Sequence, residues 1–193
     1  MGGQLRTTKR IQFMELDKDV TSSGQITSKL WLCETLEKLS WQSDTTYIYG
    51  GWHGMLAFLL LARQRFAVNN IRSYDIDPSC EPIADALNEN WVINNWRFKA
   101  FTKDCNTIVP DADLIINTAT EHFTSDQWFY NIPKGTRVIL QSNNMKHSDH
   151  ANVFNSVTEL QARYQLTETV FADKINFRYP TWFFDRYMLV GIK

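Results

Sequence analysis

The sequence contains little cysteine, no excess of charge of one sign and no long apolar run. Its three cysteines, Cys33, Cys80 and Cys105, lie far apart without a CxxC pair, so neither a disulfide framework nor a zinc site is indicated. The formal net charge of −1 disfavours nonspecific nucleic-acid binding. No run approaches the roughly 18 apolar residues of a membrane span, and the first residues are polar. We therefore expect a cytoplasmic protein that contacts no membrane.

The chain does contain enough apolar residues for a sizeable core. Hydrophobic residues make up 44% and aromatic residues 13% of its 193 residues. This length fits one domain, since domains commonly have roughly 100–200 residues. The spacing of Ile26, Leu30, Leu32, Leu36 and Leu39 predicts a helix. We expect a single domain over residues 1–193, with an N-terminal helical extension over 1–44 and a core over 45–193.

Strand-like and helix-like segments alternate along the core. The strand-like runs cover 45–49, 71–77, 98–104, 112–118 and 136–142, and helices are expected over 55–62, 78–95 and 153–164 and around 127–130. This alternation predicts parallel crossovers and a three-layer, doubly wound α/β sandwich. The last two runs, 166–177 and 182–192, are joined too closely for a helix and must pair antiparallel. The prediction is a mostly parallel seven-stranded sheet with a C-terminal antiparallel hairpin.

Loops that follow the strands are the expected ligand sites, because open α/β sheets bind ligands beyond the carboxyl ends of their strands. The first is Gly50-Gly51-Trp52-His53-Gly54, whose glycines permit a tight turn and a close approach of ligand to backbone, although any strand-to-helix turn favours glycine. Asp75 follows about 20 residues later, where a carboxylate can accept both hydroxyls of a ribose. Asp75 and Asp77 could instead cap the next helix.

This order of elements, together with the glycine loop and Asp75, resembles the class I S-adenosylmethionine (SAM)-dependent methyltransferases over about residues 45–193. Gly50 and Gly54 match the outer glycines of the family pattern, Trp52 replaces the middle one, and Ile48 stands where an acid is usual. The resemblance implies SAM as cofactor and a ribose contact at Asp75. It implies a cofactor site made of Gly50, Gly51, Trp52, His53, Gly54, Asp75, Ile76, Asp104, Cys105, Asn117 and Thr118, with adenine at Asp104 and Cys105. An Asp that ends a strand, such as Asp104, is also an ordinary turn residue.

Glu121 and His122, in the loop after the fourth strand, are the candidate catalytic residues. Either side chain could accept a proton from a nucleophile. The alternative is that they begin the short helix that contains Trp128, with Glu121 at the favourable end of its dipole. The Asn/Asp-Pro-Pro-aromatic motif of DNA and protein-amide methyltransferases is incomplete, because Asn117 is not followed by prolines.

The loop after the fifth strand is rich in amides. Gln141, Asn143 and Asn144, with Trp128, are candidate substrate-binding residues, although amides also favour turns. His147 and His150 lie close in sequence, but we find no third ligand and predict no metal site. The late aromatic residues Phe177, Trp182, Phe183 and Phe184 are expected in the core.

The sequence as a whole favours a SAM-dependent methyltransferase with a small-molecule or exposed peptide substrate. A SAM-using lyase, cyclase or aminopropyl-type transferase remains an alternative, as does a module that binds SAM or another adenosine ligand without turnover. A nicotinamide dehydrogenase is disfavoured because the glycine loop lacks the GxGxxG spacing.

Overall fold

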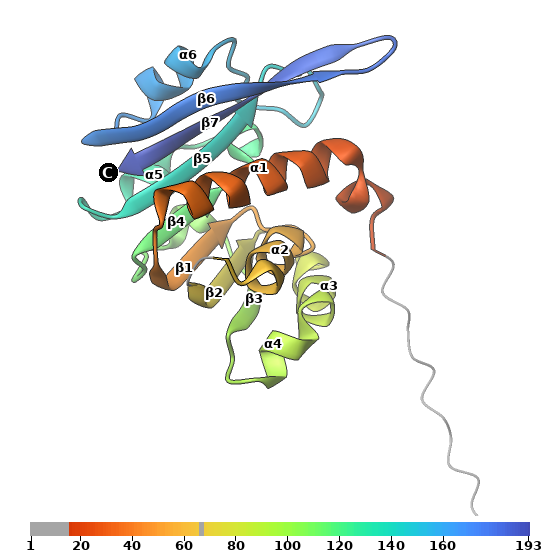
Figure 1. Ribbon diagram of the computed structural model, residues 1–193, viewed down its shortest axis with the longest axis vertical. Helices are drawn as coiled ribbons and strands as arrows, with labels where there is room; N and C mark the ends of the chain where they lie inside the picture. Colours follow the sequence, from red (N-terminus) through yellow and green to blue (C-terminus); the bar gives the residue numbers. More distant parts are fainter. Residues whose placement is uncertain (1–15, 66–67) are drawn as a thin grey trace, which may run out of the picture.

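A seven-stranded mixed sheet forms the centre of the protein (Figure 1). The computed structural model describes residues 16–65 and 68–193. The strands lie in the order β3-β2-β1-β4-β5-β7-β6. Their bounds are β1 Ser43–Tyr49, β2 Val68–Asp75, β3 Phe98–Thr102, β4 Leu114–Asn117, β5 Arg137–Asn143, β6 Glu168–Arg178 and β7 Phe183–Ile192.

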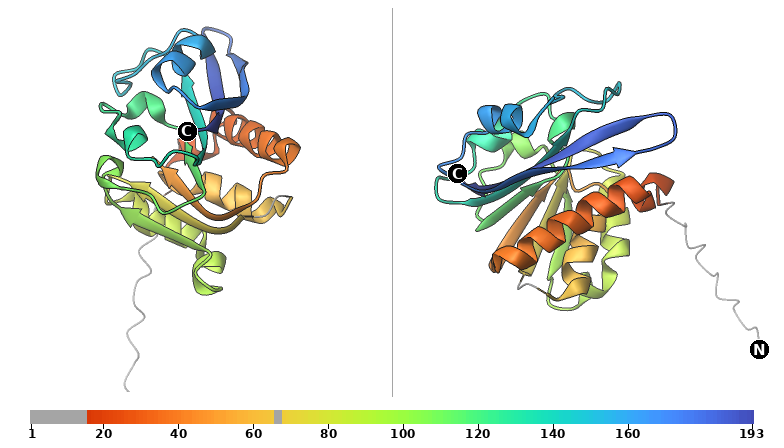
Figure 2. Two further views of the ribbon diagram at one scale, coloured as in Figure 1. Left: turned by 90° about the vertical axis from the view of Figure 1, so that its left-hand side faces the viewer. Right: turned by 45° about the horizontal axis from the view of Figure 1, so that its top comes forward.

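Strands β1 to β5 pair in parallel, and β7 pairs antiparallel with both β5 and β6. The predicted three-layer α/β sandwich, its mostly parallel sheet and its C-terminal hairpin are therefore confirmed. The pairing of β5 with β7 ends at Asn143 and Arg186, whereas β6 and β7 stay paired as far as Arg178 and Phe183. The end of the hairpin consequently extends beyond the rest of the sheet (Figures 1 and 2).

One face of the sheet is covered by α1 (Ser23–Leu39), α2 (Met55–Arg63) and α3 (Cys80–Leu87). Leu36 of α1 and Leu60 of α2 pack in one buried cluster with Ile116 of β4. Helix α1 is thus part of a helical layer, and β1 begins at Ser43, before the expected boundary at residue 44. Within residues 16–65 and 68–193, no helix is long and apolar enough to cross a membrane.

The opposite face is covered by shorter elements: η2 (Cys105–Thr107), α5 (Gln127–Tyr130) and α6 (Val157–Arg163). Their large aromatic residues, Trp128 and Tyr164, are fully buried against Ile115 and Leu140 of the sheet. Successive residues of β4 serve the two clusters alternately, as the two-residue period of a strand requires. The remaining described elements are η1 (Lys18–Thr21), α4 (Glu89–Ile93) and η3 (Thr120–His122).

The helix expected over 78–95 is divided at Asn88, so that expectation is wrong in its bounds. Asn88 is fully buried, and its Nδ2 donates to the carbonyl oxygens of Ala84 at 2.9 Å and Gly54 at 3.2 Å. At a solvent-facing position of an unbroken helix, the Asn88 amide would not make both of these bonds. The break therefore serves the contact between α3 and the loop before α2.

Gly191 in β7 provides a test of this packing. A Cβ there would lie 2.0 Å from the carbonyl oxygen of Glu168 in the paired strand. We expect Gly191→Ala to lower the free energy of unfolding by about 1–3 kcal/mol, as overpacking does. The control is Gly135→Ala, where nothing lies within 4 Å and only the φ of +86° opposes a side chain. Urea denaturation that shows a smaller loss for Gly191→Ala than for Gly135→Ala would contradict this account.

Candidate functional site

The carboxyl ends of β1 and β4 lie side by side at the point where the strand order reverses. Open α/β sheets place their ligand crevice at such a point. A cavity of about 820 Å³ opens there. The predicted site residues that line it are Gly50, Gly51, Trp52, His53, Asp75, Ile76, Asp104, Cys105, Thr118, Glu121, His122 and Asn143.

The loop after β1 is held to the end of β2. Gly50 and Trp52 have φ angles of +61° and +46°, a left-handed conformation that costs a non-glycine residue about 1–2 kcal/mol. The backbone N–H of Trp52 donates to Asp75 Oδ2 at 2.8 Å, which holds the residue in this conformation. A Cβ on Gly51 would lie 1.9 Å from Ser73 Oγ, so the loop also needs glycine for close packing.

His53 belongs to the same loop, and its ring stacks on Trp52 at a centroid distance of 4.9 Å. Its Nδ1 accepts from the backbone N–H of Asp17 at 3.4 Å. Burial lowers the pKa of His53, against the opposing effect of nearby carboxylates, of which Asp17 has the largest. The imidazole is therefore favoured in its neutral form.

Asp75 and Ile76 form a second wall. Asp75 Oδ1 accepts from the N–H of Asp77 at 3.1 Å, so each carboxylate oxygen has one backbone donor and keeps a lone pair for a ligand. The side chain of Ile76 beside it is 70% exposed. A carboxylate next to an uncovered apolar side chain suits a ligand that has a diol and an apolar ring.

Asp104 and Cys105 lie at the start of η2. Asp104 Oδ1 accepts from the backbone N–H of Asn106 at 2.9 Å and from its Nδ2 at 3.0 Å, so this residue does cap a turn while lining the cavity. Burial raises the pKa of Cys105 to about 12, and of Cys33 and Cys80 likewise. These thiols are consequently protonated at neutral pH and poor nucleophiles.

Five predicted site residues lie outside the cavity lining: Gly54, Asn117, Trp128, Gln141 and Asn144. The fully buried Trp128 belongs to the core. A Cβ on Gly54 would lie 2.7 Å from Asn88 Nδ2, so this glycine serves helix packing. The three amides bond to backbone: Asn117 accepts from Ala119 N, Gln141 donates to Ser28 O, and Asn144 accepts from Asp185 N.

Glu121 forms a buried ion pair with Arg186 of β7. Glu121 is 2% and Arg186 8% exposed, and Arg186 Nη1 lies 2.6 Å from Glu121 Oε1. The same oxygen accepts from Asn143 Nδ2 at 2.6 Å, and Arg186 Nη2 donates to the carbonyl oxygen of Thr118. Helix α5 begins at Gln127 after Asp126, so Glu121 does not begin that helix, and the helix-start alternative is wrong.

Lys29 of α1 is a further charged group of the cavity. It is 8% exposed, and its Nζ donates to Gln25 Oε1. Burial, followed by the charge of Arg186, lowers the pKa of Lys29 to about 7, although Asp19 and Glu121 oppose the shift. An amine of this kind can change its protonation state near neutral pH.

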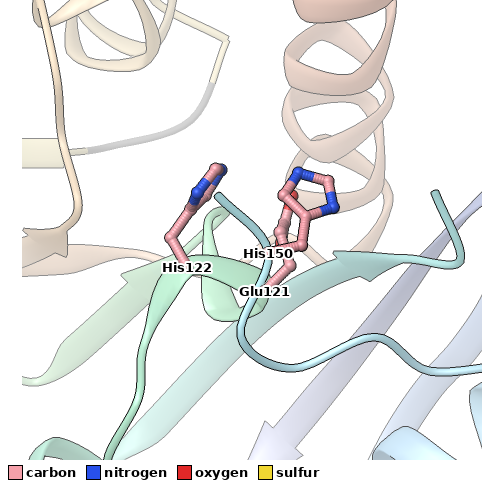
Figure 3. A group of neighbouring side chains, drawn as sticks. All are labelled: Glu121, His122 and His150. Carbon is pink, nitrogen blue, oxygen red and sulfur yellow. The ribbon is translucent and has the colours of Figure 1, made fainter. Parts of the chain in front are cut away.

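His150 completes a group with Glu121 and His122 (Figure 3). One ligand atom from each residue lies within 4.8 Å of the other two. The rings of His122 and His150 meet edge to face at a centroid distance of 4.8 Å. In the sequence His150 lies near His147 alone, whereas the fold brings it, in the loop after β5, to Glu121 and His122 in the loop after β4.

Aromatic rings from the projecting end of the β6–β7 hairpin form another wall. Tyr179 stacks on Trp182 at 4.3 Å, Trp182 on Phe184 at 5.5 Å and Phe184 on Phe177 at 4.8 Å, and all four line the cavity. Trp182 is 46% and Phe183 77% exposed, so the expectation of a core position is wrong for these two residues.

Sequence reasoning missed Lys29, His150 and Arg186. Each lies far along the chain from Glu121 and reaches it only through the fold. The one local signal was a charged residue inside an apolar stretch, as in Arg186 among Tyr187, Met188 and Leu189. Such a residue in a buried strand needs a partner of opposite charge.

Solved structures with the same fold include several methyltransferases. The N-methyltransferase NodS from Bradyrhizobium japonicum, in complex with S-adenosylhomocysteine (SAH), is 10% identical, covers 92% of this chain and 94% of its own, and has a TM-score of 0.68. The magnesium protoporphyrin IX methyltransferase ChlM from Synechocystis with bound SAH is 10% identical, with 86% and 83% covered and a TM-score of 0.62. The YcgJ protein from Bacillus subtilis is 14% identical, with 87% and 98% covered and a TM-score of 0.64.

No protein-family model matches the sequence, and no curated protein matches it either. The similarity is thus one of structure. The chain has the Rossmann-like α/β fold of SAM-dependent methyltransferases, as the sequence resemblance predicted.

The buried ion pair gives a direct test of the cavity floor. Glu121→Gln leaves the buried charge of Arg186 without a partner, and we expect a loss of about 3–5 kcal/mol in the free energy of unfolding. His122→Asn, at the exposed neighbouring residue, should change it by less than about 0.5 kcal/mol. Chemical denaturation measures both. Equal stability of the two variants would show that the pair does not hold the loops together.

Lys29 predicts a dependence of stability on pH. Its pKa of about 7 in the folded state lies below the unfolded value of about 10.4, so the unfolded chain binds more protons between them. The free energy of unfolding should therefore gain a few kcal/mol from this group as pH rises through that interval. In Lys29→Met the gain should vanish in denaturation series, with the exposed Lys38→Met of the same helix as control. If the pH profile of Lys29→Met matched that of the unaltered protein, the lowered pKa of Lys29 would be contradicted.

Proposed function

We propose that this chain is a SAM-dependent methyltransferase whose acceptor is a small molecule or an exposed peptide group. The observation that carries the proposal is one cavity at the switch point of the sheet, with Asp75 at the end of β2 on one side and Glu121 and His122 on the other. The fold alone would support many activities.

The residues of the first side fit SAM. The carboxylate of Asp75 keeps lone pairs for two ribose hydroxyls, and the exposed Ile76 offers an apolar surface to adenine. Gly50 and Gly51 bring backbone to the cavity, and we assign Asp104, which also lines it, to the adenine. The neutral His53 places no positive charge beside the sulfonium of SAM.

When bound, SAM would supply a methyl group: the acceptor's lone pair forms the new bond to the methyl carbon, the electron pair of the broken S–C bond stays on sulfur, and the acceptor's proton is released to solvent. The chain's own contribution is to orient the acceptor and exclude water. We assign Glu121 and His122 to this acceptor side, because they follow β4, which β1 separates from β2 and Asp75, and Glu121 bonds to Asn143 of β5. The buried pairing of Glu121 with Arg186 makes it an orienting group.

Two features support a small acceptor. The net charge of −1 gives no attraction for a nucleic acid. The stacked rings of Tyr179, Trp182 and Phe184 form a wall that suits an acceptor with a planar or apolar part.

Asp75→Asn tests the cofactor assignment. The amide keeps the shape, but its one oxygen can accept from only one of the backbone N–H groups of Trp52 and Asp77, and the charged acceptor of two hydroxyls is lost. Chemical denaturation of the variant measures how much of the effect comes from the loop. We expect SAM binding to weaken by roughly 2–4 kcal/mol in calorimetric titration. Asp77→Asn is the matched control, because Asp77 accepts from Ser79 N at the start of the next helix and lies outside the cavity lining.

The same titration compares SAM, SAH and NAD on the unaltered protein. SAM and SAH should bind and NAD should not. Binding of NAD alone would overturn the proposal in favour of a dehydrogenase, and wild-type SAM affinity in Asp75→Asn would remove the ribose assignment. Binding of SAM without turnover on any acceptor would favour a binding module.

A further inference from the structure

The cluster of Glu121, His122 and His150 has the donor set of a metal site. It offers two imidazoles and one carboxylate from two loops that meet at the cavity (Figure 3). Ligands of one tetrahedral ion lie about 3–3.5 Å apart, given metal–ligand distances near 2.0–2.2 Å. The ligand atoms of the cluster lie within 4.8 Å of one another, so small shifts of the side chains would bring them to the spacing of metal ligands.

Both histidines are anchored as metal-binding histidines are. His122 Nδ1 lies 3.1 Å from the carbonyl oxygen of Asp149, and His150 Nδ1 lies 2.7 Å from that of Met145. A carbonyl only accepts, so each Nδ1 carries the proton and each Nε2 keeps a lone pair. Metal-ligating histidines typically donate their other ring N–H to a carbonyl or carboxylate in this way.

The two carboxylate oxygens of Glu121 likewise differ: one is held by hydrogen bonds and the other is available to a ligand. Its Oε1 accepts from Arg186 and Asn143, which fixes the direction of the carboxylate. Its Oε2 is buried and has no hydrogen-bond partner in the described part of the chain. An unpaired carboxylate oxygen is costly to bury, and a cation would satisfy it.

The charges of the site decide which cations suit it. The cluster has one carboxylate, Glu121, and Arg186 offsets its charge. It therefore lacks the several carboxylates on which Ca²⁺ and Mg²⁺ depend. Two imidazoles instead favour the first-row transition metals, including Zn²⁺ and Co²⁺. Three protein ligands leave open coordination positions.

From these observations we propose that Glu121 Oε2, His122 Nε2 and His150 Nε2 bind one divalent transition-metal ion of the Zn²⁺ type. This deepens the proposed function and rests on it for its purpose: the open positions take an oxygen of the acceptor and orient it within the cavity. The inference replaces the expectation from sequence that the chain has no metal site.

The test is a titration of metal-free protein, with any purification tag removed, with Co²⁺ followed by visible absorption and with Zn²⁺ by calorimetry. We expect one ion per chain and a Co²⁺ spectrum of low coordination number. His122→Ala and His150→Ala should each weaken binding at least about 10-fold, since even the loss of a supporting residue costs 10–100-fold. Glu121 is left unaltered because its replacement would leave the buried charge of Arg186 without a partner.

His147→Ala is the matched control, since its ring lies 5.6 Å from that of His150 in the same loop but outside the cluster. It should bind Co²⁺ as the unaltered protein does. A loss in His147→Ala with full binding in His122→Ala would overturn the proposal in favour of a surface histidine pair. Binding of Mg²⁺ but not of Zn²⁺, or of no ion, would overturn it as well.

SAM titration of the same metal-free samples separates this proposal from the proposed function. SAM binding without binding of Zn²⁺ or Co²⁺ refutes the metal site alone. Binding of one metal ion without SAM binding supports the site and refutes the cofactor.

Discussion

The buried ion pair of Glu121 and Arg186 fixes the acceptor side of the cavity. It connects the loop after β4 to β7, and Asn143 adds the end of β5 to the same oxygen. The backbone oxygen of Glu121 also accepts from two N–H groups that follow His150. Separating these segments would leave a charge buried without a partner, which costs several kcal/mol. The positions of the candidate ligands therefore depend on one electrostatic contact.

The opposite side of the cavity depends on backbone conformation. Asp75 holds the N–H of Trp52, which explains how a tryptophan keeps a left-handed conformation where the methyltransferase pattern has glycine. The pattern also has an acid at Ile48, but that side chain is buried in the core. The carboxylate at the end of β2 thus holds the loop while it lines the cavity.

Sequence reasoning found the features that arise within one segment. Runs rich in β-branched and aromatic residues predicted the strands, and the position of Asp75 after such a run predicted a carboxylate at the end of β2, where it lines the cavity. It did not find contacts between distant segments, such as Lys29 near Arg186 or His150 near Glu121. Polar residue type alone does not separate substrate ligands from partners of the backbone. Gln141 and Asn144 both bond to backbone groups, which need hydrogen-bond partners when they are buried. The exposure of Trp182 follows from the strand pairing, because this residue lies at the end of the hairpin, beyond the last pair of β5 with β7.

The two sides of the cavity impose different demands on their charges. A sulfonium and a methyl acceptor both react best where positive charge is sparse, yet Arg186 and Lys29 lie in this cavity. Arg186 is offset by Glu121 at 2.6 Å, and burial lowers the pKa of Lys29 to about 7, so it can shed its charge. The positive charge that remains is small. A metal ion at Glu121 would add positive charge at one defined point beside the acceptor, where it would favour loss of the acceptor's proton and so generate the nucleophile.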